Sequence, residues 1–443
     1  MSSEQRLRLD NARILPCEDK TVIENGSLVV VGSRIAWLGK ASEMPEEFQS
    51  IDQIIDVNHR TLMPGLVDAH MHISFGEASS EEELSIHTPP AYRAIRASVD
   101  AKKVILAGVT SACDPGGPRG IATAVRDAIS AGLVVGPRMA AAGPQITTQQ
   151  GIGDTLPAPL GDLPNSIGAL VRSRDEIIQE IRNELKDGVD LIKIAGSGPG
   201  TREFGSFTLT ELEVAVTEAH RLNLPIAIHA RSRQSIADAV NAGFDWIMHA
   251  SYMDDPTLDL LVSKKIPIVP AMTLLVNSLE SEKGIVPIGT LDAIQRELDA
   301  AVNILSKARI AGAKLIAGSE TGFSMTPYGQ WHSREMELFV DLLGFSNHDA
   351  LLAMTRDATS AIPRFGKLIG TLSPGKYADM LIVDGKPDID VKLLGDKKNI
   401  NEIMKSGNFI AQDSIGSSRK QHLFERTRVY THGIYDRKKS QES

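Results

Sequence analysis

The residues with the clearest chemical potential are His70 and His72, which end the apolar segment Gly65-Leu-Val-Asp-Ala-His-Met-His72. On a β-strand, residues i and i+2 face the same side, so both imidazoles are expected to point the same way. Two neutral imidazoles that converge at a strand end provide half of a transition-metal site. The alternative is a strand that exposes both histidines to solvent. The presence of further metal-binding side chains elsewhere in the chain would favour the metal site.

Lys193 lies inside the apolar segment Leu191–Gly196. Burying an ammonium group in such a strand is costly unless the charge is paired or neutralised. A desolvated lysine with a lowered pKa is also reactive, for example with carbon dioxide, which yields a carbamate able to bridge two cations. The alternative is a lysine that extends its ammonium group toward solvent.

Three further candidates each end an apolar segment: His229, His249 and Glu320. The two histidines are 20 positions apart, which corresponds to about one strand–helix unit. This spacing predicts neighbouring strands and, with the first histidine pair, metal ligands. Glu320 is predicted to bind a metal, to accept a proton from its water, or both. Core histidines with one hydrogen bond and a salt-bridged glutamate at the rim are the alternatives.

Eight strands are expected to position these residues, and most of them are followed by an amphipathic helical stretch. This alternation predicts an α/β fold, specifically a (β/α)8 TIM barrel, in which the carboxyl ends of the strands face the active site. A doubly wound open sheet is the competitor, but no Gly-x-Gly-x-x-Gly follows a strand. The predicted strands are Leu66–His72, Val109–Asp114, Arg138–Ile146, Leu191–Gly196, Ile226–Ala230, Trp246–Ser251, Ile266–Met272 and Leu315–Glu320.

Both ends of the chain have the sequence pattern of short strands rather than helices. Residues 26–31 and 34–39 predict a hairpin around a glycine-containing turn. Residues 370–385 again have a sequence pattern typical of strands. We therefore predict a small composite β-sandwich domain from residues 1–64 and 371–443, with the barrel occupying residues 65–370.

The composition is that of an ordinary globular chain of 443 residues, with 42% hydrophobic residues, 23% charged residues and a formal net charge of −9. This charge gives no indication of a nucleic-acid or membrane partner, and no apolar run reaches the roughly 20 residues that span a bilayer. Only Cys17 and Cys113 occur, and the first residues lack a secretory signal pattern. We expect a cytoplasmic protein.

The segment Met63–His72, together with Lys193, His229, His249 and the segment Gly370–Val383, resembles the amidohydrolase superfamily. The similarity is to the imidazolonepropionase-like branch, which includes Xaa-Pro dipeptidases, ochratoxin-type amidases and hydrolases of aryl ureas and thiocarbamates. The resemblance implies two divalent metal ions, usually zinc, and often a homo-oligomer. His70, His72 and Glu320 would hold one ion and His229 and His249 the other, with carboxylated Lys193 and a hydroxide bridging both.

The reaction implied by this resemblance is hydrolysis of an amide-type C–N bond in a small molecule, such as an amide, dipeptide, urea or carbamate. Glu320 and Lys193 are the catalytic candidates, and Glu320 departs from the family pattern, which has aspartate there. Tyr252, Arg231 and His332 lie on predicted loops and are candidate substrate-binding residues.

Two other functions remain possible on the same fold. A mononuclear metal deaminase would carry a glutamate three residues after the strand-five histidine, where this chain has Ser232, and would lack the bridging lysine. A non-catalytic scaffold would have lost metal ligands that this chain retains. Nothing in the sequence selects one amide-type substrate over the others.

Overall fold

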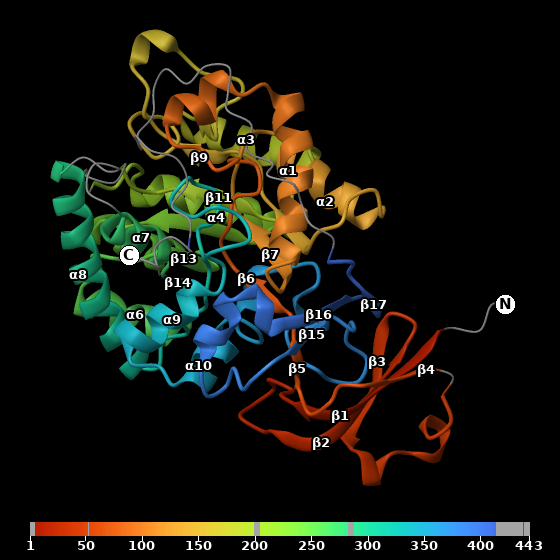
Figure 1. The fold of residues 1–443 in the computed structure, drawn as a ribbon. Coiled ribbons are helices and arrows are strands. Elements are labelled where there is room, and N and C mark those ends of the chain that lie inside the picture. The colour runs from red at the N-terminus through yellow and green to blue at the C-terminus, as the bar shows by residue number, and fades with distance from the viewer. Residues whose placement is uncertain (1–4, 52, 199–203, 282–287, 413–436, 438–443) are drawn as a thin grey trace.

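The computed structural model describes residues 5–51, 53–198, 204–281, 288–412 and 437. Within them the chain forms an α/β fold that contains one mixed sheet and two parallel sheets (Figure 1). The predicted fold class, α/β with parallel strands, is therefore confirmed. Of the described residues, no helix has both the length and the apolar character needed to cross a membrane.

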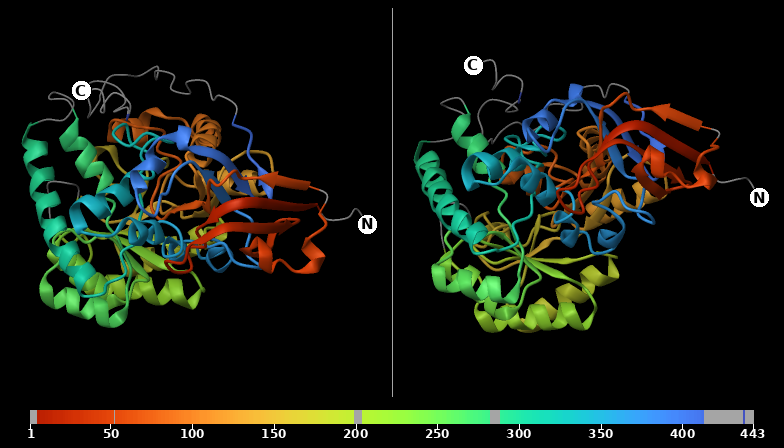
Figure 2. Two further views of the ribbon diagram at one scale, coloured as in Figure 1. Left: turned by 60° about the horizontal axis from the view of Figure 1, so that its bottom comes forward. Right: turned by 90° about the horizontal axis from the view of Figure 1, so that it is seen from below.

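The mixed sheet contains strands from both ends of the chain, in the order β17-β16-β15-β5-β1-β2-β3, with β4 beside β1. Figures 1 and 2 show the red N-terminal strands next to the blue C-terminal strands. These strands are β1 (Arg6–Ile14), β2 (Ile23–Val31), β3 (Arg34–Lys40), β4 (Gln53–Asp56), β5 (Thr61–Pro64), β15 (Met380–Val383), β16 (Ile400–Lys405) and β17 (Asn408–Phe409).

The two chain ends are joined where β15 pairs antiparallel with β5. Alternating apolar residues from both ends, such as Leu9, Leu62 and Met380, are buried in one cluster, as the alternation of strand faces requires. The predicted hairpin is present, because β2 pairs antiparallel with β3. Beyond residue 412 the predicted C-terminal domain lies outside the described residues, Arg437 excepted.

The parallel strands form two sheets, one in the order β6-β7-β8 and one in the order β10-β9-β11-β12-β13-β14. Backbone hydrogen bonds link them at both sides, from Asp190 N to Ala141 O (2.8 Å) and from Ala69 N to Ala317 O (3.1 Å). The strands are β6 (Leu66–Asp68), β7 (Val109–Asp114), β8 (Arg138–Ala141), β9 (Gln145–Thr147), β10 (Gly168–Leu170), β11 (Ile192–Ala195), β12 (Ile226–Ala230), β13 (Trp246–His249) and β14 (Ile268–Val269).

Helices lie along the outer side of the parallel strands, and Figure 2 shows this most clearly for the green helices. Their amphipathic patterns bury one face against the strands, as expected for helices that cover a parallel sheet. The helices are α1 (Pro90–Ile105), α2 (Ile121–Ser130), α3 (Arg174–Lys186), α4 (Leu209–Arg221), α5 (Arg233–Ala242), α6 (Asp255–Lys264), α7 (Thr273–Glu280), α8 (Ile288–Ile310), α9 (Arg334–Leu343) and α10 (Asn347–Ala353).

The structure corrects four predicted strands. The predicted seventh strand, Ile266–Met272, is reduced to β14. The predicted strand Arg138–Ile146 is divided into β8 and β9, and the predicted first strand ends at Asp68, before both histidines. The predicted eighth strand has only an isolated parallel bridge from Leu315 to Ile268. The predicted eighth strand ends at Glu320, whose left-handed backbone (φ 52°) turns the chain out of strand geometry.

The mixed sheet is attached to the parallel strands by a buried ion pair between Arg138 of β8 and Asp379. Arg138 Nε donates to Asp379 Oδ2 at 2.6 Å, and these side chains are 11% and 2% exposed. The guanidinium also lies 3.6 Å from the ring centroid of Tyr377. Because Asp379 O accepts from Gly65 N (3.1 Å), the pair lies at the entrance to the histidine segment.

We predict that Arg138→Met lowers the free energy of unfolding by about 3 kcal/mol, because it leaves a buried carboxylate without its cation. The measurement is the midpoint of denaturant unfolding. Arg172→Met is the matched control, since Arg172 and its partner Asp162 are 46% and 56% exposed. That control should lose less than about 1 kcal/mol. Equal losses in the two variants would contradict the prediction.

Candidate metal centre

His70 and His72 follow the end of β6 in a segment that still alternates like a strand. Met71, between them, forms a parallel bridge to Thr321, and Met71 N donates to Cys113 O at 3.0 Å. The two histidines therefore face the same side, as predicted, and both are at least 97% buried. Their Nε2 atoms lie 3.1 Å apart.

The structure brings the other two histidines to the same place. His229 lies in β12 and His249 ends β13, and their ring centroids are 4.5 Å apart. The ring of His249 is 5.5 Å from that of His70. All four imidazoles are thus contiguous, although they come from three separate chain segments.

Glu320 completes the cluster from the segment that follows Leu315. Ligand atoms of His70, His72 and Glu320 all lie within 4.8 Å of one another, and Glu320 Oε1 is 3.8 Å from His249 Nε2. The carboxylate therefore reaches the histidines although its side chain is one methylene longer than the aspartate of the family pattern. Its backbone has a left-handed φ of 52°, which redirects the side chain at that point.

The glycines on both sides of Glu320 permit this approach. A Cβ atom on Gly318 would lie 2.7 Å from His70 N, and one on Gly322 would lie 2.6 Å from His72 O. The segment Gly318-Ser-Glu-Thr-Gly322 can therefore pass directly against the histidine segment only without those side chains.

Burial sets the protonation of the cluster. The pKa values of His70, His229 and His249 lie well below the usual imidazole value, chiefly because of desolvation, with the positive charges of Lys193 and Arg231 also contributing. Desolvation raises the pKa of the Glu320 carboxyl. Neutral imidazoles expose the lone pairs that metal coordination requires.

Lys193, in β11, is 1% exposed and its Nζ contacts the sulfur atom of Met248. Desolvation lowers the pKa of its ammonium group to about 7, while the charge of Glu320 opposes this shift. A substantial fraction of the side chain is therefore a neutral, nucleophilic amine at neutral pH. The charge of Lys193 also lowers the pKa of His70 and His229, which places it electrostatically beside the histidines.

Arg231 and Tyr252, the first two candidate substrate-binding residues, lie on adjoining loops, because Tyr252 N donates to Arg231 O at 3.1 Å. The guanidinium Nε of Arg231 lies 3.2 Å from Glu297 Oε1 of α8. Ser251 Oγ donates to the same carboxylate oxygen at 2.9 Å. Arg231 is thus held beside the histidines, whose pKa values its charge depresses.

His332, the third candidate, is placed differently. It is 1% exposed, its Nδ1 lies 2.8 Å from Asp68 Oδ2, and its Nε2 accepts from Gly329 N at 3.1 Å. Both ring nitrogens therefore already have partners within the chain. This arrangement gives His332 no free polar atom for a substrate.

Two buried carboxylates were not among the predicted site residues. Asp68 accepts from His70 N (3.1 Å), and Asp114 accepts from Gly116 N (3.0 Å), whose carbonyl oxygen lies 2.7 Å from His72 Nδ1. The bond to Gly116 places the proton of His72 on Nδ1 and leaves Nε2 as a ligand atom. The available signal was an acidic residue within each of two segments that the sequence predicts as strands.

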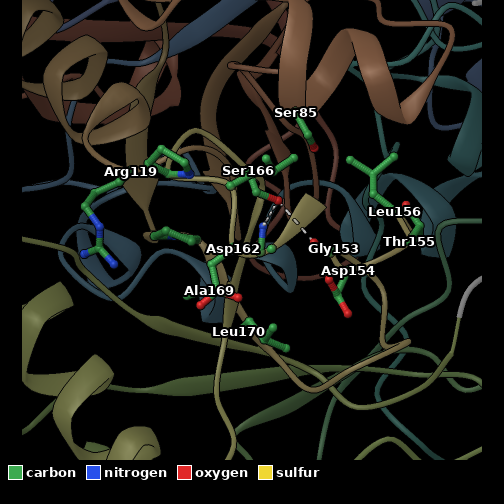
Figure 3. Close-up of a pocket in the computed structure, with 15 residues that line it drawn as sticks. Ser85, Arg119, Gly153, Asp154, Thr155, Leu156, Asp162, Ser166, Ala169 and Leu170 are labelled. Atoms are coloured by element: carbon green, nitrogen blue, oxygen red, sulfur yellow. Dashed lines mark hydrogen bonds between the residues drawn. The ribbon is translucent and has the colours of Figure 1, made fainter. Parts of the chain in front are cut away.

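A cavity of about 450 Å³ lies between the loops that follow the first three predicted strands (Figure 3). It is lined by Ser85, Arg119 and parts of the stretch 144–170. No predicted site residue lines it. Ile167, within this stretch, is buried in one cluster with Phe75 and Leu84. Phe75 stacks on the ring of His72, with the ring centroids 4.0 Å apart.

The donor set fits a divalent metal. Three ring nitrogens of this cluster are buried and have no hydrogen-bond partner among the described residues: His70 Nδ1, His229 Nε2 and His249 Nε2. Buried polar atoms without partners are rare in native proteins, and a bound cation would satisfy lone pairs that lie in one cluster. Four imidazoles and a carboxylate are the ligands that zinc and similar ions prefer.

Comparisons with known proteins find relatives over nearly the whole chain. A sequence model of the Amidohydrolase family matches residues 61–410. Ochratoxinase of Aspergillus niger is 26% identical over 438 aligned residues, which cover 94% of this chain and 89% of that protein.

Solved structures are similar over the same length. The ochratoxinase crystal structure has a TM-score of 0.84 at 24% identity and covers 95% of this chain and 99% of its own. A Xaa-Pro dipeptidase with bound methionine has a TM-score of 0.81 at 25% identity over 92% and 100% of the two chains. Molinate hydrolase, at 19% identity over 93% and 95% of the two chains, has a TM-score of 0.75 and is similar in fold.

We predict that purified protein contains about two divalent ions per chain, the number that a two-metal site binds. His229→Asn should lower the metal content measured by elemental mass spectrometry, because it removes a nitrogen ligand. The matched control is His348→Asn, on α10, outside the cluster. A folded, active protein free of metal would contradict this prediction, as would equal metal loss in both variants.

Proposed function

Since the chain belongs to the amidohydrolase family, we propose that it is a metal-dependent hydrolase of amide-type C–N bonds in small molecules. The observation that carries this proposal is the convergence of four buried histidines and a buried carboxylate, with ring nitrogens left unpaired. The similarity to ochratoxinase and to a Xaa-Pro dipeptidase supports a substrate of the amide or dipeptide class.

We propose two divalent ions, with zinc as the most suitable metal for this ligand set. His70, His72 and Glu320 would hold one ion, and His229 and His249 the other, with Lys193 between them. Such ions polarise a scissile carbonyl and acidify water. Support comes from the unpaired ring nitrogens of three of these histidines.

In this proposal Lys193 acts as a carbamate. Its neutral amine adds to carbon dioxide and releases a proton, which gives a carboxylate on a long side chain. The physical support is burial of the side chain and the lowering of its pKa to about 7. Without such a modification, the ammonium form would oppose the binding of cations by its neighbours.

Glu320 is proposed to take a proton from the attacking water and to deliver it to the leaving nitrogen. Desolvation raises the pKa of its carboxyl group, which makes the carboxylate a better base than an exposed one. Arg231 and Tyr252 are proposed to bind the carbonyl oxygen or an anionic group of the substrate. Support for Arg231 is its fixed position beside the histidines, where Glu297 holds it.

We also propose that the eight strand segments close into a (β/α)8 barrel spanning residues 65–370, with residues 1–64 and 371–443 as one composite domain. The hydrogen bonds that link the two parallel sheets support the first part. The pairing of β15 with β5 supports the second. A homo-oligomer is proposed from the family alone.

We predict that Lys193→Ala loses turnover and much of its bound metal, because it removes the group proposed to bridge the ions. Lys405→Ala is the matched control, since burial lowers the pKa of Lys405 to about 8 but the residue lies in β16, in the mixed sheet. The measurements are metal content and hydrolysis rate. Full activity in Lys193→Ala would remove the carbamate from the proposal.

We predict that Glu320→Gln lowers kcat by about 10²–10⁴-fold, the usual contribution of a general base. The amide retains the size of the side chain but cannot accept the proton. Glu320→Asp keeps the carboxylate and should retain more activity than Glu320→Gln. If the glutamine variant keeps wild-type kcat, Glu320 is not the base.

The substrate class is tested by a screen of Xaa-Pro and other dipeptides, N-acyl amino acids, aryl ureas and thiocarbamates. The proposal expects both products of C–N cleavage to appear. Their formation is measured by chromatography. Release of ammonia alone from an aminated ring would favour a deaminase instead. Inactivity of the metal-loaded protein toward every class would contradict the proposed function.

A further inference from the structure

The carboxylate of Asp68 is fully buried and accepts four hydrogen bonds. Its Oδ1 accepts from His70 N (3.1 Å) and Ser319 N (3.0 Å). Its Oδ2 accepts from Ser319 Oγ (2.6 Å) and from His332 Nδ1 (2.8 Å). One side chain thus joins the first strand, the eighth strand segment and the loop after it.

The tautomer of His332 follows from its surroundings. Its Nε2 accepts from the backbone N–H of Gly329 at 3.1 Å, so the ring proton lies on Nδ1 and is donated to Asp68. The imidazole is 1% exposed. Because both ring positions are defined by partners, His332 is held in one orientation.

These bonds hold the two segments that carry the candidate ligands. Asp68 lies two residues before His70, and Ser319 lies one residue before Glu320. Between the same segments, Glu320 N donates to His70 O at 2.6 Å. The backbone carbonyl of Glu320 accepts from Thr326 Oγ1 at 2.9 Å, so the peptide groups on both sides of Glu320 are hydrogen-bonded.

The backbone in this region needs such support. Glu320 has a φ of 52°, a conformation that residues with side chains seldom adopt and that persists only where surrounding contacts hold it. The buried carboxylate of Asp68 also needs hydrogen-bond donors, since a buried charge is tolerated only when it is well hydrogen-bonded. His332 supplies the donor that comes from outside the two ligand-bearing segments.

We propose that Asp68 and His332 form a positioning pair that sets the separation between His70 and Glu320 for metal binding. Neither residue touches substrate or metal in this proposal. It rests on the proposed function, because it assigns the purpose of the pair to the metal site. It also explains why His332 is not directed at a substrate.

The test compares His332→Leu, which removes the donor, with His332→Asn, whose side-chain amide can donate from nearly the position of Nδ1. Ser319→Ala removes a second donor to the same carboxylate with little change in volume. His348→Leu, on α10, is the control for loss of a histidine elsewhere. Apoprotein of each variant is titrated with zinc against a chelator, and its thermal unfolding is recorded.

We expect His332→Leu to bind zinc about 10–100-fold more weakly, as for other residues that orient metal ligands. His332→Asn should recover most of that affinity, Ser319→Ala should show a smaller loss, and His348→Leu should match the wild type. For any substrate that the wild type cleaves, the loss in His332→Leu should fall on kcat more than on KM once zinc is saturating.

The proposal is overturned if folded His332→Leu binds zinc within twofold of the wild type, whatever its unfolding temperature. It is also overturned if His332→Asn loses as much affinity as His332→Leu, because packing rather than the donor would then be responsible. If His332→Leu does not fold, unchanged zinc affinity in Ser319→Ala overturns it. Wild-type protein that binds no divalent metal overturns the proposed function itself, which is a distinct result.

Discussion

The candidate site depends on the close approach of the eighth strand segment to the first. Glu320 N lies 2.6 Å from His70 O, and Gly318 and Gly322 provide the space that this contact requires. A methyl group at either glycine would collide with the histidine segment. The left-handed backbone of Glu320 then turns its carboxylate toward the imidazoles. This junction brings the carboxylate of Glu320 to within 3.8 Å of His249 Nε2.

The electrostatics of the site follow from the burial that this packing creates. Desolvation keeps His70, His229 and His249 neutral and moves the pKa of Lys193 to about 7. Three ring nitrogens of this cluster remain without partners among the described residues, so the site as folded contains unsatisfied polar atoms. A cation that accepts these lone pairs would relieve that cost, which is the physical reason for favouring metal chemistry over a structural role.

The mixed sheet contributes to the site although it lies outside the parallel strands. Gly65, at the start of the histidine segment, donates to the backbone oxygen of Asp379, whose carboxylate pairs with Arg138 of β8. Both chain ends therefore take part in fixing where the first strand begins. This coupling gives a physical reason for a segment of parallel strands and helices that is enclosed, in sequence, by the two parts of one mixed sheet.

The sequence by itself determined the α/β class, most helices and strands, and the types of residue at the strand ends, because periodicity and burial are local properties. It also predicted His70, His72, His229, His249 and Glu320 as one cluster, since parallel strands bring their carboxyl ends together. Tertiary structure alone decided the rest. The division of the third predicted strand, the early end of the first, the burial of His332 and the role of Asp68 depend on contacts between residues up to about 260 positions apart. Such contacts leave no periodic signal, because they are set by how closely two backbones approach and by which donors that approach brings to a buried carboxylate.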